Sequence, residues 1–397
     1  MTTTTRDLTT RPAPDRAERT AAQLLQAYSR ADTFLRTPTR TLLGHGRQSQ
    51  LRADVPRSSL AEHAHLSALA DDVAGGAGVV LGAVPFAADA PAQLVVPETL
   101  HSATGECRPG PSARALLAPD SRLTAVPSAA TYRQAVADAL AAIEAGTLRK
   151  VVLARALDLA APDGFDVGAL LQELLHRRSG DYVFAVPLPS DRILVGASPE
   201  LLVSRTGPAV RAVPLAGSAP RSDDPAVDER RAAELLASTK ARHEHAVVVA
   251  AVADALAPLC TGLAVAQEPS LVCTPTMWHL GTAVTGSAEH STALDLALAL
   301  HPTPAVCGTP ADLAAAAIDE LEPFDRGFFA GATGWLDAAG NGEWTVTLRC
   351  AEIGESTLRL FAGAGIVAGS VPAEEADETT AKFSTLLSVL GVGGGSV

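Results

Sequence analysis

The order of strand-like and helical segments most constrains the fold of this 397-residue chain. Apolar runs typical of strands follow one another without a helix after each, and Gly354-Glu355-Ser356 separates two late runs as a hairpin turn does. Parallel strands need long helical crossovers, whereas antiparallel strands can be joined by tight turns. The pattern therefore predicts an α+β fold with mainly antiparallel sheets. The expected strands are Lys150–Leu157, Tyr182–Val186, Arg192–Gly196, Leu201–Ser204, Val210–Leu215, Glu343–Ile353 and Thr357–Ala362.

Helices are predicted where apolar residues recur three or four positions apart and where capping residues stand at the ends. Asp224-Pro225 has the pattern of an N-cap followed by proline in the first turn, and we expect one long helix from there to about Leu256. Further helices are expected at Thr292–Leu300, Ala311–Leu321 and Pro372–Leu390. Residues 104–126, rich in Pro and Gly, predict a loop.

Composition limits the class of protein. The formal net charge of −13 argues against nucleic acid or an anionic membrane as the main partner. The five cysteines form no CxxC pair, so neither a disulfide framework nor a zinc site is indicated. Residues 1–20 have no signal-peptide core and predict a disordered leader, and residues 21–397 are expected to form a single catalytic domain. We expect a soluble cytoplasmic protein. Lysine is scarce in the chain, and from composition alone we attribute this scarcity to coding bias without functional meaning.

Lys150 and Glu200 are candidates for a base and an acid. Lys150 shares a strand face with Val152 and Ala154, and an ammonium group desolvated by such neighbours has a lowered pKa. Glu200 follows Pro199 at a turn between two strands, where a side chain can project into a cleft. A solvent-reaching lysine and a solvated turn carboxylate are the alternatives when each residue is taken alone.

Three glutamates are candidates for a metal site. Glu244 shares a helix face with apolar residues, where an unpaired carboxylate is costly. Glu375 and Glu378 lie on one stripe of the last helix with Lys382. Glu244 and Glu378 together offer the oxygen ligands that suit Mg²⁺, which keeps waters and takes substrate oxygens. Structural ion pairs remain the alternative for both helices.

Arg349 is predicted on the polar face of a strand with Thr345 and Thr347, where a guanidinium can hold a carboxylate through two hydrogen bonds. A cross-strand salt bridge is the competing interpretation. His279 could be a core histidine or a site residue. The glycine-rich segment Gly363–Gly369 departs from the dinucleotide-binding spacing, so its glycines are expected to permit close backbone approach to a ligand or to the last helix.

Taken together, the motifs strongly resemble the chorismate-utilising enzymes, and among them the isochorismate synthases of siderophore pathways. The resemblance spans about residues 21–390 and is clearest after Tyr132. The matching pieces are Lys150–Arg155, Gly196–Leu202, Pro214–Ser218, Arg242–His245, His279-Leu280, Leu300–Ala305, Leu321–Arg326, Gly340–Cys350 and Leu360–Ile366. The family fold that it implies has two large antiparallel sheets packed together, with helices outside and the active site between the sheets.

The resemblance also implies roles for these residues. Lys150 would activate water for attack at C2 of chorismate, and Glu200 would protonate the departing C4 hydroxyl. Glu244 and Glu378, with Glu375 nearby, would bind a Mg²⁺ ion that holds the ring carboxylate. The substrate-binding residues that it implies are Ser198, Gly217, His279, Ala305, Phe329, Arg349, Gly363 and Lys382.

Two comparisons within the family favour isochorismate as the product. Members that use ammonia typically carry Gln where this chain has Lys150, and the aminodeoxychorismate branch often has Lys at Ala216, so water is expected as the nucleophile, with no glutaminase partner. Salicylate synthases tend to have Thr at Ala305 and Tyr at Phe329. A salicylate synthase and a catalytically silent chorismate-binding protein remain the alternatives, and a monomer is expected. Gly327, where relatives often carry Glu, is a departure from the pattern.

Overall fold

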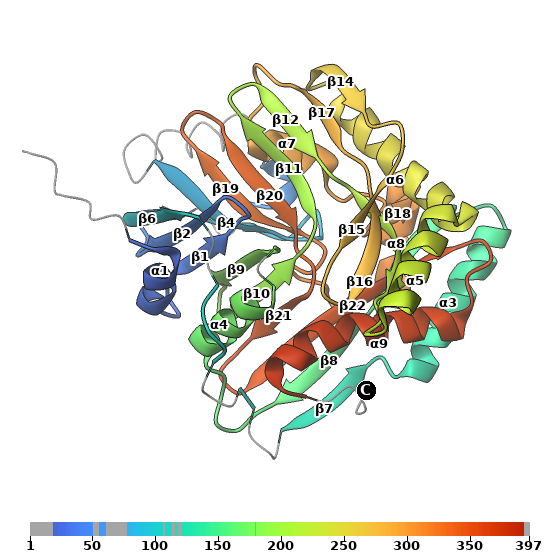
Figure 1. Cartoon of the computed structure of the whole chain (residues 1–397), viewed down its shortest axis with the longest axis horizontal. Helices are drawn as coiled ribbons and strands as arrows, with labels where there is room; N and C mark the ends of the chain where they lie inside the picture. The colour runs from blue at the N-terminus through green and yellow to red at the C-terminus, as the bar shows by residue number, and fades with distance from the viewer. Residues whose placement is uncertain are drawn as a thin grey trace, which may run out of the picture.

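The computed structural model describes residues 19–50, 55–60, 78–105, 108–112, 116–117, 121–178 and 180–392. Figure 1 shows the course of the chain through these residues. The predicted leader therefore lies outside the described residues except for Arg19 and Thr20, and the Thr20 hydroxyl caps the first helix, α1, by accepting a hydrogen bond from the Gln23 backbone N–H. The glycine-rich tail also lies outside them from residue 393 onward.

Three sheets, antiparallel at every pairing, account for the strands among the described residues. The largest has ten strands in this part of the chain. In spatial order they are β18 (Gly308–Thr309), β8 (Lys150–Ala160), β22 (Thr357–Val367), β21 (Cys350–Ile353), β10 (Ile193–Ser198), β9 (Tyr182–Pro187), β1 (Thr33–Arg36), β2 (Arg40–His45) and β6 (Thr99–Thr104), while β7 (Arg122–Val126) also pairs with β8.

The second large sheet has nine strands among the described residues, and a small third sheet has three. The second contains β14 (Thr261–Val265), β17 (Val284–Ser287), β12 (Ala209–Ala212), β11 (Leu201–Thr206), β20 (Gly342–Val346), β19 (Ala332–Asp337), β4 (Val79–Val84), β5 (Gln93–Val96) and β3 (Ser49–Gln50). The third contains β13 (Leu215–Pro220), β16 (Met277–Gly281) and β15 (Ser270–Cys273).

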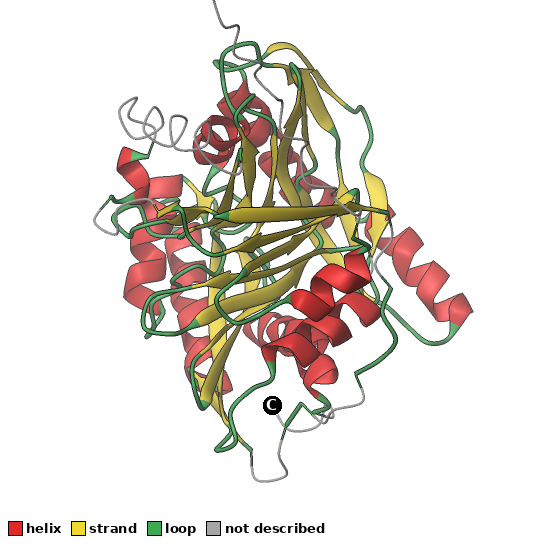
Figure 2. Ribbon diagram, turned by 90° about the vertical axis from the view of Figure 1, so that its left-hand side faces the viewer, coloured by secondary structure: helices red, strands yellow, loops and turns green. Residues whose placement is uncertain are grey.

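The helices surround the sheets, as Figure 2 shows. They are α1 (Ala21–Ala27), α3 (Ala129–Glu144), α4 (Val167–Arg177), α5 (Pro225–Ala237), α6 (Thr239–Leu256), α7 (Ala293–Leu300), α8 (Ala311–Leu321) and α9 (Pro372–Leu390), with a short 3₁₀ turn at Arg57–Ser59. In Figure 1, α9 crosses β22 on the outer face of the largest sheet, which α1 and α4 also cover.

Alternation along the strands builds two apolar cores. In β9, Phe184 and Val186 belong to the core shared by the two large sheets, while Val183 and Ala185 pack beneath the outer helices. Successive side chains of a strand point to opposite faces, so a strand buried on both sides is apolar throughout. The expected architecture of two packed antiparallel sheets with helices outside is confirmed, and the third sheet is an addition to it.

Four expectations about individual elements need correction. The single helix expected up to Leu256 is two helices, because Ser238 has extended backbone angles and caps both. The expected strand Glu343–Ile353 is divided between the two large sheets, and Val210–Leu215 is divided between β12 and β13. The last part of the loop expected at residues 104–126 is strand β7, which pairs with β8.

Candidate active site

A cavity of about 590 Å³ lies between β8 and β22 of the largest sheet, the third sheet, and helices α5, α6 and α9. It is large enough for a small organic substrate. The predicted site residues in its wall are Lys150, Glu200, Gly217, Glu244, His279, Ala305, Phe329, Arg349, Gly363, Glu375, Glu378 and Lys382. Residues more than two hundred positions apart thus converge on one cavity.

Lys150, the first residue of β8, is buried with 3% of its surface exposed. Its Nζ donates a hydrogen bond of 2.7 Å to Glu244 Oε1 on α6. Gly365 on the adjacent strand makes room for this pair, since a Cβ there would stand 2.8 Å from Glu244 Oε1 and 3.2 Å from Lys150 Cε. The alternative of a solvent-reaching lysine is therefore excluded. Close approach to a ligand or to the last helix was expected of these glycines, whereas Gly365 makes room for side chains of α6 and β8.

Glu200 occupies the turn between β10 and β11 and is 4% exposed. Burial raises the pKa of its carboxyl group to about 7, against the opposing effects of a hydrogen bond from the Leu215 N–H and the charges of Lys150, Lys382 and Arg349. That hydrogen bond, 3.2 Å long, joins the Leu215 nitrogen to Glu200 Oε1. The group can therefore hold or release a proton near neutrality, which a solvated turn carboxylate could not do.

Helix α9 contributes two carboxylates and a lysine. Lys382 Nζ lies 2.7 Å from Glu378 Oε1 and donates to the Gly363 carbonyl oxygen at 2.7 Å. Burial opposes the charge of Glu378, but the Lys382 ammonium and the Ser218 hydroxyl hold its pKa below the ordinary value. Burial raises the pKa of Glu375, a rise that the nearby charge of Glu378 increases. Two adjacent carboxyl groups in one wall thus differ in proton affinity.

The donor set fits a magnesium ion better than a closed metal site. The described residues contain no group of three or more histidine, cysteine, aspartate or glutamate side chains placed to hold a metal. Glu244 and Glu378 nevertheless line the same cavity from different helices, and each is neutralised by one lysine. Mg²⁺ needs only one or two protein carboxylates, because waters and substrate oxygens complete its octahedron.

Arg349 lies between β20 and β21, where the chain passes from one large sheet to the other. Its φ of 47° bends the chain here, so it is not on the strand that the sequence predicted. Arg349 Nη2 lies 3.0 Å from His279 Nε2, and burial together with the charge of Arg349 lowers the pKa of His279, leaving the imidazole neutral to accept that hydrogen bond. Arg349 Nη1 is buried without a hydrogen-bond partner, which leaves one guanidinium donor available for an anion.

One predicted residue stands apart. Ser198, the last residue of β10, is fully buried and is not in the cavity wall. Its hydroxyl oxygen accepts a hydrogen bond of 3.3 Å from the Glu200 N–H. The prediction that Ser198 lines the pocket is therefore corrected, because its side chain is turned into the protein and holds the turn that carries Glu200.

Sequence reasoning missed other wall residues. Ser218 donates a hydrogen bond of 3.2 Å to Glu378 Oε1, and Phe361 stacks on Phe329 with ring centroids 5.1 Å apart. Ser218 could have been found, since it ends the matching block Pro214–Ser218. Phe361 could have been found in the same way, since it lies in the matching block Leu360–Ile366. Lys240 on α6 also lines the wall.

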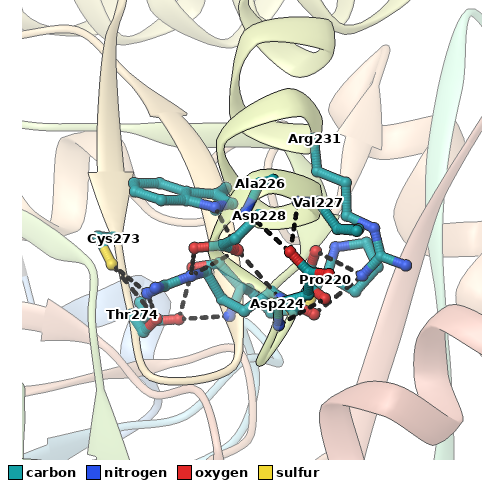
Figure 3. Close-up of polar contacts among 12 residues, drawn as sticks. Pro220, Asp224, Ala226, Val227, Asp228, Arg231, Cys273 and Thr274 are labelled. Carbon is teal, nitrogen blue, oxygen red and sulfur yellow. Dashed lines mark hydrogen bonds and ion pairs between the residues drawn. The ribbon is translucent and has the colours of Figure 1, made fainter.

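A hydrogen-bonded cluster attaches α5 to the third sheet beside the cavity (Figure 3). Asp228 on α5 accepts two hydrogen bonds from Arg221 Nε and one from Trp278 Nε1, with donor–acceptor distances between 2.8 and 3.0 Å. The guanidinium of Arg221 also lies over the Trp278 ring. Because Trp278 precedes His279 on β16, this cluster fixes α5 and the strand that carries His279 relative to each other.

Comparison with known proteins places this geometry in a family. The sequence model described as "Chorismate binding enzyme" matches residues 101–391. The chain is 47% identical to isochorismate synthase DhbC of Bacillus subtilis strain 168, over 94% of this chain and 97% of that protein. The chain belongs to the chorismate-binding enzyme family.

Other members of the family agree in sequence and in fold. Isochorismate synthase EntC of Escherichia coli K12 is 42% identical over 79% of this chain and 81% of its own length. A crystal structure described as that of DhbC, a 2,3-dihydroxybenzoate-specific isochorismate synthase from Bacillus anthracis, has a TM-score of 0.88 and 45% identity, covering 94% of this chain and 100% of that one. Anthranilate synthase component I of Streptococcus pneumoniae shares the fold at 19% identity, with a TM-score of 0.73, over 88% of this chain and 92% of its own. None of the helices in the described part of this chain is both long and apolar enough to span a membrane.

Proposed function

We propose that this chain is a Mg²⁺-dependent isochorismate synthase, which converts chorismate to isochorismate. The observation that carries the proposal is the placement of Lys150 and the buried carboxyl group of Glu200, with a pKa of about 7, in the wall of one cavity. A water molecule adds its oxygen to C2 of the ring, the double bonds shift, and the C4 hydroxyl leaves as water. One water enters and one departs, so the reaction is an isomerisation.

The chain's own residues divide the proton transfers. Lys150 takes a proton from the attacking water and acts in its neutral amine form, so its Nζ must part from Glu244 Oε1, which lies 2.7 Å away. Glu200 donates its proton to the departing hydroxyl, which its raised pKa permits near pH 7. Only interactions that strengthen in the transition state accelerate the reaction, and both groups meet charge that develops there.

The remaining wall residues would hold the two carboxylates of chorismate. The free Nη1 of Arg349 would bind one of them, oriented by the neutral His279 and assisted by Lys382 and the Gly363 backbone. Glu244 and Glu378, with Glu375 beside them, would bind Mg²⁺, whose charge stabilises the ring carboxylate. Gly217, Ala305 and Phe329 would shape the cavity around the ring.

The names of several relatives support a role in supplying 2,3-dihydroxybenzoate to siderophore synthesis, since one is a vibriobactin-specific isochorismate synthase of Vibrio cholerae. We further propose that the chain acts in the cytoplasm as a monomer. It would need no glutaminase partner, because Lys150 favours water over ammonia as the nucleophile.

The test is incubation with chorismate, with and without Mg²⁺, followed by separation of the products by liquid chromatography. We expect isochorismate only with Mg²⁺ and without pyruvate, and no turnover by Lys150→Met. Salicylate with pyruvate would transfer the assignment to a salicylate synthase and show that Ala305 and Phe329 do not prevent elimination. Full activity of Lys150→Met would remove Lys150 from the role of base.

A further inference from the structure

The chain contains only three lysines, Lys150, Lys240 and Lys382, among 31 lysine and arginine residues. All three line the one cavity, although they lie on three different elements. Composition alone assigned no functional meaning to the scarcity of lysine. The convergence of the three lysines on one cavity does indicate a function. Two of them are bound to wall carboxylates. Lys240 is the one that the proposed mechanism does not use.

Lys240 occupies an unusual place for a cation. It is the second residue of α6, two positions after the break at Ser238, in a first turn that contains no acidic residue. A helix N-terminus carries partial positive charge, so a lysine there is unfavourable for the helix itself. A residue that breaks a local rule in this way is often retained for a site. The compensating negative charges come from another element, since Glu375 and Glu378 on α9 line the same cavity as Lys240.

Lys240 lies in a solvent-exposed part of the cavity wall. Its side chain is exposed, in contrast to the buried Lys150. Ser238, Arg231 and Glu234, from the α5–α6 segment, line the same wall. Among the described residues, Lys240 takes part in no hydrogen bond or ion pair, so its ammonium is available to a ligand that approaches from solvent.

Charge counting shows what Lys240 contributes. The wall carries five carboxylates, Glu200, Glu234, Glu244, Glu375 and Glu378, and five cations, Lys150, Arg231, Lys240, Arg349 and Lys382. Lys150 and Lys382 are already paired with Glu244 and Glu378, so Lys240 is a wall cation whose charge no ion pair offsets, in a protein whose formal charge is −13. An incoming substrate with two carboxylates would be attracted to this charge, because charged cleft walls focus the field on incoming ions.

We propose that Lys240 is a substrate-capture residue, which attracts a dicarboxylate to the mouth of the cavity before Arg349 and the inner lysines bind it. This rests on the proposed function for the identity of the dicarboxylate. A compact, hydrated ammonium on a flexible stem suits brief capture at an exposed site. Its contribution belongs to association, so it acts on kcat/KM and leaves the chemical step unchanged.

The experiment compares Lys240→Met, Lys240→Glu and Lys240→Arg with the wild type, in chorismate turnover with Mg²⁺ at low and high ionic strength. We expect Lys240→Met to lower kcat/KM about fivefold at low salt with kcat unchanged, Lys240→Glu to lower it further, and both differences to shrink at high salt. Lys240→Arg keeps the charge and should stay within about twofold of the wild type. The matched control is Arg242→Met, which removes a partly exposed cation two residues away that is paired with Glu268.

A second measurement separates this proposal from the function on which it rests. Isothermal titration of chorismate, without turnover, should show weaker binding to Lys240→Met than to the wild type and to Arg242→Met. Equal kcat/KM and equal affinity for Lys240→Met and wild type would overturn the role of Lys240, even in an active isochorismate synthase. If the wild type bound chorismate but formed no isochorismate, the proposed function would fail and the titration would still decide the role of Lys240.

Discussion

At the scale of single residues, the site depends on groups whose properties burial changes. Glu200 has a carboxyl group with an ordinary pKa near 4.5, which burial raises to about 7. Arg349 has a donor without a partner, and His279 is kept neutral beside it. A buried carboxyl group and an unpaired guanidinium donor each cost stability. Each becomes useful when a bound substrate supplies an acceptor for the proton or an anion for the donor. Such costs at functional sites are common in enzymes.

Glu200→Gln is expected to separate stability from activity. The folded-state pKa of Glu200 lies above its unfolded value, so folding is favoured while the group is protonated, and this contribution is lost as pH rises from about 4.5 to 7. The loss is about 3 kcal/mol as an order of magnitude, at 1.36 kcal/mol for each pKa unit. Glutamine stays neutral, so the variant should be more stable than the wild type at pH 8 and nearly equal at pH 4, measured as melting temperature. Its kcat should fall by about 10² or more, because the proton donor is gone. An equal stability difference at both pH values would contradict the raised pKa.

At the scale of elements, the site is built where regular structure is interrupted. The break at Ser238 directs α6 so that Glu244 enters the cavity, and the bend at Arg349 carries the chain between sheets. Strand β22 contributes in another way. Glycine has no side chain, so Gly365 leaves space for the Lys150–Glu244 pair. The glycine-rich segment is therefore a strand that makes room for side chains from β8 and α6.

Gly365→Ala tests this use of β22. The added Cβ would stand 2.8 Å from Glu244 Oε1, so the pair must shift, while the fold should tolerate a contact with side-chain ends. We expect kcat to fall about tenfold, as small misplacements of catalytic groups are costly, with a melting temperature close to that of the wild type. Gly168→Ala on α4 is the matched control, because its Cβ would meet only Asp166 Oδ1 at 3.4 Å. Unchanged kcat in Gly365→Ala would show that the pair can move without consequence.

Ser238 offers a second test at this scale. Its hydroxyl oxygen accepts a hydrogen bond of 3.2 Å from the Ala241 N–H and so caps α6. Ser238→Ala should lower the free energy of unfolding by about 1 kcal/mol, measured by denaturant titration. Ser238→Gly should cost less, since glycine is itself a tolerated cap. A larger loss for glycine than for alanine would argue against the capping role.

At the scale of the whole molecule, the cavity lies where the sheets meet. Lys150 and Gly363 come from the largest sheet, His279 and Gly217 from the third, and Arg349 from the connection between the two large sheets. A bound substrate would therefore contact all three of these parts of the structure at once. Ligand binding to the native state alone stabilises it by mass action.

Chorismate with Mg²⁺ should therefore raise the melting temperature of Glu200→Gln, in which turnover is slow. At a ligand concentration of about 100 times Kd the gain is about 2.7 kcal/mol, or a few degrees for a chain of this size. Adding Arg349→Ala in the same background should remove most of the shift, as should omission of chorismate. A shift that survives Arg349→Ala would mean that the carboxylate binds elsewhere.

Local sequence determined much of this protein. The order of strand-like and helical segments, with a hairpin turn, predicted the antiparallel α+β class. Helices α8 and α9 were predicted with the bounds Ala311–Leu321 and Pro372–Leu390 that they have. Periodicity, caps and turn residues are local properties, so they can be recognised without knowing the partners of a segment. Residue patterns also offered candidates such as Lys150, Glu200 and Glu244, but each allowed a structural alternative, and the resemblance to a family supplied their roles.

Only the tertiary structure decided how those residues meet. Lys150 and Glu244 are 94 positions apart and lie within 2.7 Å because β8, β22 and α6 pack together. Arg349 leaves the predicted strand because the chain must change sheets there, and Ser198 turns inward because β10 is buried on both faces. In the sequence Lys240 resembles any surface lysine. Only the tertiary structure shows that it lines the same cavity as Lys150 and Lys382. Distances between remote segments depend on how sheets and helices pack, and no local pattern contains that information.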